Sequence, residues 1–166
     1  MCSSDLVELD LDGPDALRAA CRRILVRVRA HHPAARIDGL LVQSMERGLA
    51  EAIVGFRRDP NVGPVVVLGA GGTLAEVYRD FSVRIAPVGM DEALRMVAEV
   101  KGLAPIRGYR NLPRGDCDAL ARAVHAVSLL ACIEGAGVAE AEINPLIVRG
   151  EGVVAVDGLI VPGPTV

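Results

Sequence analysis

The stretch from Glu140 to Ile160 holds carboxylate and amide side chains that are spaced to meet across a hairpin. Two apolar-rich runs flank Arg149-Gly150-Glu151-Gly152, whose glycines favour a tight reversal of the chain. With the turn centred in this sequence, Asn144 lies opposite Asp157, and the alternation of a strand places Glu142 on the same face. Glu140 belongs to that polar face as well.

Such a polar face can bind a metal ion. Directly opposed residues on neighbouring strands have Cβ atoms about 5 Å apart. Mg²⁺ prefers oxygen ligands and usually takes one or two protein groups, with water and substrate phosphates completing its shell. The hairpin therefore predicts magnesium ligands at Asn144 and Asp157. A solvated polar face on a half-buried hairpin explains the same spacing, and a slip of one residue would exchange the faces.

The same register makes two further predictions about the hairpin. Val148 is expected opposite Val153, and Leu146 opposite Ala155. Side chains of the other parity are expected to pack on the core: Ala141, Ile143, Ile147, Val154, Val156 and Ile160.

A second candidate site is the glycine-rich turn Gly69–Thr73, which follows the continuous apolar run Pro64–Leu68. A glycine-rich turn between a strand and a helix lets backbone N–H groups approach an anion. The sequence matches neither complete phosphate-binding pattern, and a purely structural turn explains it equally well.

These residues must be positioned by alternating strands and helices. Apolar patterning predicts strands at Leu6–Leu11, Ile37–Met45, Ala50–Arg57, Pro64–Leu68, Ser82–Pro87 and in the two arms of the hairpin. Helices are expected at about Asp15–Ala30, Leu74–Asp80, Asp91–Val100 and Asp116–Cys132, with a loop over residues 101–115. This order predicts an α+β fold: a two-layer sandwich of a mixed or antiparallel sheet with helices across one face.

Composition excludes several functions. A net charge of −3 and an aromatic content of 2% disfavour nucleic-acid binding, and the charge gives no attraction to an anionic membrane. The longest apolar runs are too short to cross a bilayer. The four cysteines form no C-x-x-C pair, which disfavours zinc binding. Since no secretory signal is recognised, we expect a reduced, cytoplasmic protein.

Residues 1–6 differ in character from the rest of the chain. The run Cys-Ser-Ser-Asp-Leu also matches a translated sequencing adapter. We interpret residues 1–6 as a foreign or disordered start of a truncated reading frame, and residues 7–166 as the natural portion.

Seven blocks then carry a family resemblance over nearly the whole chain from residue 7. They are Leu41–Met45, Glu51–Gly55, Arg58–Val66, Gly69–Glu76, Arg84–Pro87, Glu142–Leu146 and Val156–Gly158. In this order they resemble the ATP-grasp portion of NDP-forming acyl-CoA synthetases, a group that includes ADP-forming acetyl-CoA synthetase and is related to the succinyl-CoA synthetase β subunit. Glu-Ile-Asn-Pro-Leu followed by Asp-Gly is the most specific block.

The resemblance implies residue roles. Asn144 and Asp157 match the family's magnesium ligands, and Glu142 matches a catalytic acidic residue near the histidine that accepts the phosphoryl group. Residues that match nucleotide-cleft or phosphate motifs are Glu51, Arg58, Gly71, Gly72, Glu76 and Arg84. For Arg84, an ordinary surface position is an equal alternative.

The resemblance also implies an activity and partners. The expected cofactors are ATP or ADP and Mg²⁺, and the expected chemistry is phosphoryl transfer coupled to acyl-CoA formation or cleavage. The chain matches a C-terminal ATP-grasp subdomain. The N-terminal ATP-grasp half and the CoA-binding domains or subunit, which would bring CoA and the carboxylic acid, are absent. Lys101 is the only lysine and does not match the family's phosphate-binding lysine. We therefore expect a fragment that is inactive alone.

Two alternatives remain open. The chain can be a non-catalytic nucleotide- or subunit-binding module that kept the fold without turnover. It can also be part of a fusion with a regulatory or acetyltransferase domain. An upstream ATP-grasp half or a separate partner gene would favour the synthetase.

Overall fold

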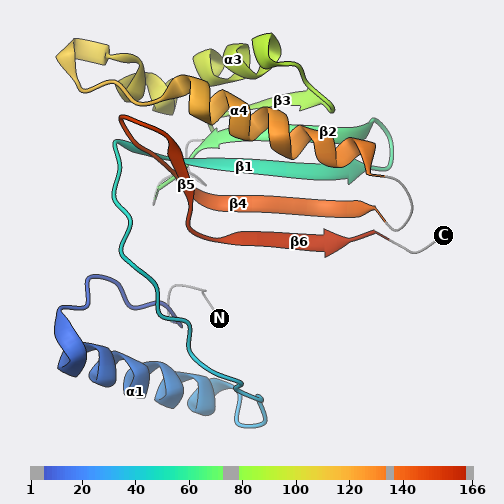
Figure 1. The fold of residues 1–166 in the computed structure, drawn as a ribbon. Coiled ribbons are helices and arrows are strands. Elements are labelled where there is room, and N and C mark those ends of the chain that lie inside the picture. Colours follow the sequence, from blue (N-terminus) through green and yellow to red (C-terminus); the bar gives the residue numbers. More distant parts are fainter. Residues whose placement is uncertain (1–5, 73–78, 134–136, 164–166) are drawn as a thin grey trace. The chain divides into compact units, whose positions relative to one another are not determined.

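The computed structural model describes residues 6–72, 79–133 and 137–163 (Figure 1). The chain divides into two compact units, Met1–Met45 and Glu46–Val166. Within the described ranges, no helix combines the length and apolar character that a membrane crossing requires.

The first unit is built on one helix, α1 (Gly13–His31). Proline in its first turn fixes a helical φ, and Asp15 near its start and Arg29 near its end complement the helix dipole. The predicted helix is thus confirmed. Glu8 accepts hydrogen bonds from Arg23 and Arg27 on the helix surface.

The two strands predicted in this unit are wrong. Leu6–Leu11 and Ile37–Met45 form no strand, although the second has the expected apolar content. A strand requires a neighbouring strand for its backbone hydrogen bonds, and the described part of this unit supplies no such neighbour.

The second unit contains an antiparallel sheet, which agrees with the predicted α+β class. Its strands are β1 (Ala50–Asp59), β2 (Gly63–Ala70), β3 (Phe81–Ile85), β4 (Val138–Val148), β5 (Val153–Ala155) and β6 (Gly158–Pro162). Their order is β3-β2-β1-β4-β5, and β6 also pairs with β4. Asp59 shapes the β1–β2 turn, because its Oδ1 accepts hydrogen bonds from the Asn61 and Val62 N–H groups.

Helices α3 (Met90–Glu99) and α4 (Cys117–Ser128) pack on one face of this sheet (Figure 1). The helix predicted at Asp91–Val100 is confirmed. The helix predicted at Asp116–Cys132 ends as α4 at Ser128 and continues as the short 3₁₀ helix η4 (Leu129–Cys132).

The loop predicted at residues 101–115 is partly wrong. It contains two 3₁₀ helices, η2 (Lys101–Arg107) and η3 (Tyr109–Asn111). Burial of Leu103 and Ile106 in the core holds η2 in place. The helix predicted at Leu74–Asp80 lies mainly outside the described residues.

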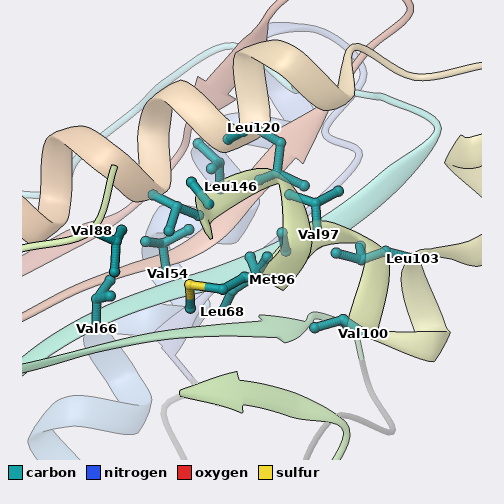
Figure 2. Close-up of a cluster of buried hydrophobic side chains, with 14 of the residues drawn as sticks. Val54, Val66, Leu68, Val88, Met96, Val97, Val100, Leu103, Leu120 and Leu146 are labelled. Carbon is teal, nitrogen blue, oxygen red and sulfur yellow. The ribbon is translucent and has the colours of Figure 1, made fainter. Parts of the chain in front are cut away.

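The core lies between the sheet and these helices (Figure 2). Strands β1 and β2 contribute Val54, Val66 and Leu68, while α3 and α4 contribute Met96 and Leu120. These five side chains are fully buried. With so few aromatic residues in the chain, branched aliphatic side chains supply most of the packing.

Candidate functional site

The hairpin has the predicted register. Val148 pairs with Val153 and Leu146 with Ala155 on β5. The same alignment continues into β6, where Ile143 pairs with Gly158. Between the two ladders, the Asn144 N–H donates to the Asp157 carbonyl at 3.2 Å. Asn144 and Asp157 are therefore opposite each other, as the turn sequence predicted.

The predicted core face is partly wrong, because β4 carries an irregularity. Ala52 on β1 pairs with Leu146, whereas Val54 pairs with Ile143. Strand β4 thus advances three residues while β1 advances two, so the faces of β4 exchange at Asn144-Pro145.

Ile147 and its partner Val154, both predicted to face the core, are consequently on the other side. Leu146 and Val148 point into the core cluster instead of Ile147. Ile147 lies opposite Glu51 and Val154, and Gly48 leaves space for it. Ile160 is 65% exposed because its strand is at the edge of the sheet.

The polar face brings three predicted site residues together. The Asn144 side-chain Nδ2 donates to Glu142 Oε1 at 2.9 Å. Asp157 Oδ1 accepts a hydrogen bond from the Gly158 N–H at 2.8 Å. Across the described residues, Asn144 Oδ1 and Asp157 Oδ2 have no hydrogen-bond partner. One amide oxygen and one carboxylate oxygen therefore remain as possible metal ligands.

This donor set fits a magnesium ion that also binds phosphate. No cluster of three His, Cys, Asp or Glu side chains able to hold a metal occurs in the described ranges. A cation here would take two protein oxygens, from Asn144 and Asp157, and keep other positions for water and phosphate oxygens. Mg²⁺ commonly binds in this way.

Glu51, Gly71 and Gly72 form a second group, where β1 begins and β2 ends. The Gly71 N–H donates to the Glu51 carbonyl at 2.8 Å. A Cβ on Gly71 would lie 2.9 Å from the Glu51 Cβ, and Gly72 has a φ of +93° that favours glycine. Both glycines are thus required by the local backbone, independently of any ligand.

Arg58 is not brought together with these residues. Its side chain lies on the same face of β1 as the core-facing side chains of that strand. Its Nε donates to the Val138 carbonyl at 3.0 Å. Its Nη2 reaches the carbonyls of Leu130 and Ala131 in η4. The guanidinium therefore joins the end of a helix to the start of β4.

Arg84 also lies on the helix-covered face. It donates to Glu92 on α3 at 2.6 Å and also bonds Glu99 and Ser82. Hydrogen bonds to Glu99 and Glu92 raise the pKa of the guanidinium. Arg84 lowers the pKa of Glu92, and Ser82 together with Arg84 lowers that of Glu99. The charge of Arg84 is therefore balanced within the fold.

The sequence predicted Asp116 only as the first residue of a helix. Its Oδ1 accepts from the Ala119 N–H at 2.7 Å, and its Oδ2 accepts from the Gly152 N–H at 2.9 Å. These backbone hydrogen bonds lower its pKa. The second bond ties the β4–β5 turn to α4 and so positions the hairpin. No local sequence pattern predicts the hydrogen bond between Asp116 and Gly152, because the two residues lie far apart along the chain.

A cavity of about 340 Å³ opens beside Asp116. Arg107, Arg114 and Cys117 line it, and burial raises the pKa of the Cys117 thiol. None of the predicted site residues lines this cavity. The candidate site is instead the exposed polar face of the hairpin.

Comparison with known proteins gives consistent matches. The family described as ATP-grasp domain matches residues 3–161. The chain is 42% identical over 154 residues to acetate–CoA ligase [ADP-forming] I of Archaeoglobus fulgidus, covering 93% of this chain and 22% of that protein. It is 32% identical over 155 residues to the beta subunit of acetate–CoA ligase [ADP-forming] I of Pyrococcus furiosus, covering 93% of this chain and 66% of the subunit. It thus spans less than two thirds of either relative.

Solved structures agree with these matches. The chain is similar to dinucleotide-forming acetyl-coenzyme A synthetase 1 of Ca. Korarchaeum cryptofilum in complex with coenzyme A and Ca-AMPCP, with a TM-score of 0.86 and 34% identity over 96% of this chain and 70% of that one. A second structure of that enzyme, with coenzyme A and Mg-AMPPCP, gives a TM-score of 0.80 and 30% identity over 98% of this chain and 71% of that one.

Proposed function

The chain belongs to the ATP-grasp family, and we propose that it is the part of an NDP-forming acyl-CoA synthetase that binds a magnesium nucleotide for phosphoryl transfer. The observation that carries this proposal is the opposition of Asn144 and Asp157. Each retains an oxygen without a hydrogen-bond partner in the part of the chain that the structure describes.

The roles of the residues follow from the chemistry of phosphoryl transfer. Catalysis of this reaction is mostly positioning and neutralisation of charge on the phosphate oxygens. When bound, Mg²⁺ would supply positive charge that neutralises the phosphate oxygens. Asn144 and Asp157 would hold it, and Glu142 fixes the orientation of the Asn144 amide. Glu51, Gly71 and Gly72 are proposed to line the nucleotide cleft.

The remaining parts of the reaction are assigned to other domains. We propose that an N-terminal ATP-grasp half completes the nucleotide site, and that CoA-binding domains or a partner subunit bring CoA and the carboxylic acid. The names of the relatives, which are acetate–CoA ligases [ADP-forming], support this division, as does the presence of coenzyme A in the related solved structures. Alone, the chain of residues 7–166 is expected to give little or no turnover.

Calorimetry with Mg²⁺ and the non-hydrolysable analogue AMPPCP tests the metal assignment. The wild-type chain should bind AMPPCP only when Mg²⁺ is present, and Asp157→Ala should weaken this binding at least tenfold. Asp118→Ala, which removes an exposed carboxylate on α4, is the matched control. Equal binding by the wild type and Asp157→Ala would contradict the assignment of Asp157.

A non-catalytic binding module is the second candidate. It is favoured by the structural use of Arg58 and Arg84, two residues expected at a nucleotide cleft. The two candidates differ in turnover. If the remaining domains are supplied and ADP-dependent cleavage of acyl-CoA appears, the module is a synthetase part. If the domains assemble and nucleotide binds without turnover, the second candidate holds.

A further inference from the structure

Strand β3 is an edge strand of the sheet: among the described residues, β2 pairs with it on one side and no strand pairs with it on the other. Its sequence, Phe-Ser-Val-Arg-Ile, contains no lysine or proline. Natural proteins usually protect exposed sheet edges with such residues or cover them, since an open edge pairs readily with another strand. In the part of the chain that the structure describes, no strand pairs with the outer side of β3, and neither lysine nor proline protects it.

Backbone hydrogen bonds show which residues of β3 face outward. The Ala86 N–H donates to the Pro64 carbonyl, and the Ala70 N–H donates to the Asp80 carbonyl. Residues 80 and 86 thus direct their backbone groups toward β2, and this direction alternates along an antiparallel ladder. Phe81, Val83 and Ile85 therefore direct their N–H and C=O groups away from β2.

The same three residues carry exposed apolar side chains. Phe81 is 57% exposed, Val83 42% and Ile85 67%, and their shared parity places them on one face of the sheet. Ser82 and Arg84 have the other parity and bond Glu99 on α3. The Val83 carbonyl accepts a hydrogen bond from Arg84 Nη1 at 2.9 Å, and its second lone pair can accept another. Outward backbone groups and exposed apolar side chains therefore coincide along one edge.

We propose that β3 pairs antiparallel with β3 of a second copy of this chain, joining two sheets across a twofold axis at Val83. This register places Phe81 opposite Ile85 of the second copy and Val83 opposite itself. Each of these pairs has outward backbone groups that can exchange two hydrogen bonds. On the other face, Ser82 comes opposite Arg84 of the second copy, so a hydroxyl rather than a like charge meets the guanidinium.

In this arrangement β3 is complementary to β3 of a second copy, which favours a second copy over an unrelated partner. An apolar side chain meets an apolar one on one face, and a hydrogen-bonding pair forms on the other. Specific stable interfaces usually bury about 1,200–2,000 Å². An edge of five residues is short by this measure, so the dimer should dissociate reversibly on dilution.

Sedimentation analysis of the 166-residue chain over a concentration series tests the proposal. The wild type should pass from monomer to dimer as concentration rises. Val83→Pro removes an outward N–H that β2 does not use, and it should abolish the dimer while the circular dichroism spectrum is retained. A wild type that stays monomeric at all concentrations, or a dimer that survives in folded Val83→Pro, would overturn the proposal.

Two variants of opposite charge give a test whose outcome does not depend on whether a single variant misfolds. Val83→Lys and Val83→Glu each place like charges opposite one another across the axis, so each alone should be monomeric. An equimolar mixture should restore the dimer. Ile160→Lys on β6, at an exposed position of another strand, should leave the wild-type dimer unchanged. Failure of the mixture to associate, or loss of the dimer in Ile160→Lys, would contradict pairing through β3.

Discussion

The side-chain nitrogen of Asn144 donates to Glu142 Oε1 at 2.9 Å, and this bond determines which atom of the amide is available to a cation. An amide has a donating and an accepting end. With its nitrogen held by the carboxylate, Asn144 keeps its oxygen without a hydrogen-bond partner among the described residues. Glu142 is therefore a positioning residue for the proposed metal ligand, in addition to the catalytic role that the family resemblance implies.

Removal of the Glu142 carboxylate is expected to weaken metal binding. Loss of a group that orients a metal ligand typically lowers metal affinity about 10–100-fold. Glu142→Ala should therefore raise the Mg²⁺ concentration needed for AMPPCP binding, measured by calorimetric titration. Glu140→Ala changes a carboxylate on the same strand, at the residue opposite Arg57 in the ladder, and serves as the control. An unchanged Mg²⁺ requirement in Glu142→Ala would exclude the positioning role.

Gly71→Ala is expected to destabilise the chain. The new Cβ would lie 2.9 Å from the Glu51 Cβ and 3.0 Å from its backbone carbon, so the backbone must shift. Overpacking of this kind costs about 1–3 kcal/mol in free energy of unfolding, which urea denaturation can measure. At Gly150 a Cβ would meet its nearest atom at 3.8 Å, so Gly150→Ala is the control. Equal stability of the two variants would refute the close contact at Glu51.

The ion pairs of Arg84 predict a pH dependence of stability. Because the pKa values of Glu92 and Glu99 are lowered in the folded chain, the unfolded chain binds more protons as the pH falls. The stabilisation is complete above the ordinary carboxyl pKa of 4.5 and is lost as the pH falls through the lowered values. Tm should therefore fall on acidification, and Arg84→Met should lower Tm at neutral pH and reduce this fall.

Thermal unfolding followed by circular dichroism over a pH series measures both effects. Arg18→Met is the control, because the Arg18–Asp15 pair is exposed and such pairs contribute little. An Arg84→Met variant with the same pH profile as the wild type would show that the network does not stabilise the fold.

Leu120→Ala should be strongly destabilising. Leu120 is fully buried between α4 and the sheet, and truncation of such a side chain leaves a cavity (Figure 2). The expected loss is about 2–5 kcal/mol in free energy of unfolding, measured by urea denaturation. Leu159→Ala, at a side chain that is 59% exposed, should stay within about 0.5 kcal/mol of the wild type. Similar losses for both would mean that α4 does not cover the core.

Local sequence signals predicted the hairpin well. Glycines around residue 150 fixed the turn, and the turn fixed the opposition of Asn144 and Asp157. The exchange of faces after Asn144 depends on how β4 pairs with β1, which lies far away in the sequence, so no periodicity within the hairpin reveals it.

The other differences have the same origin in long-range contacts. Ile37–Met45 has the composition of a strand, but strand formation needs a neighbour that its own residues cannot supply. The residue type of Arg84 is suited to phosphate binding, but only the tertiary structure shows that it faces two carboxylates on α3. The metal and nucleotide roles themselves stay predictions that binding measurements must decide.

The double use of Asp116 has a consequence for the order in which this chain gains and loses structure. Its carboxylate joins the start of α4, three residues away, to the β4–β5 turn, 36 residues away. A local contact and a long-range contact thus depend on one side chain, so fraying of either element exposes the other. In amide hydrogen exchange, the Ala119 and Gly152 N–H groups should open as one cooperative unit. The proposed metal ligands are therefore rigid only as long as α4 is.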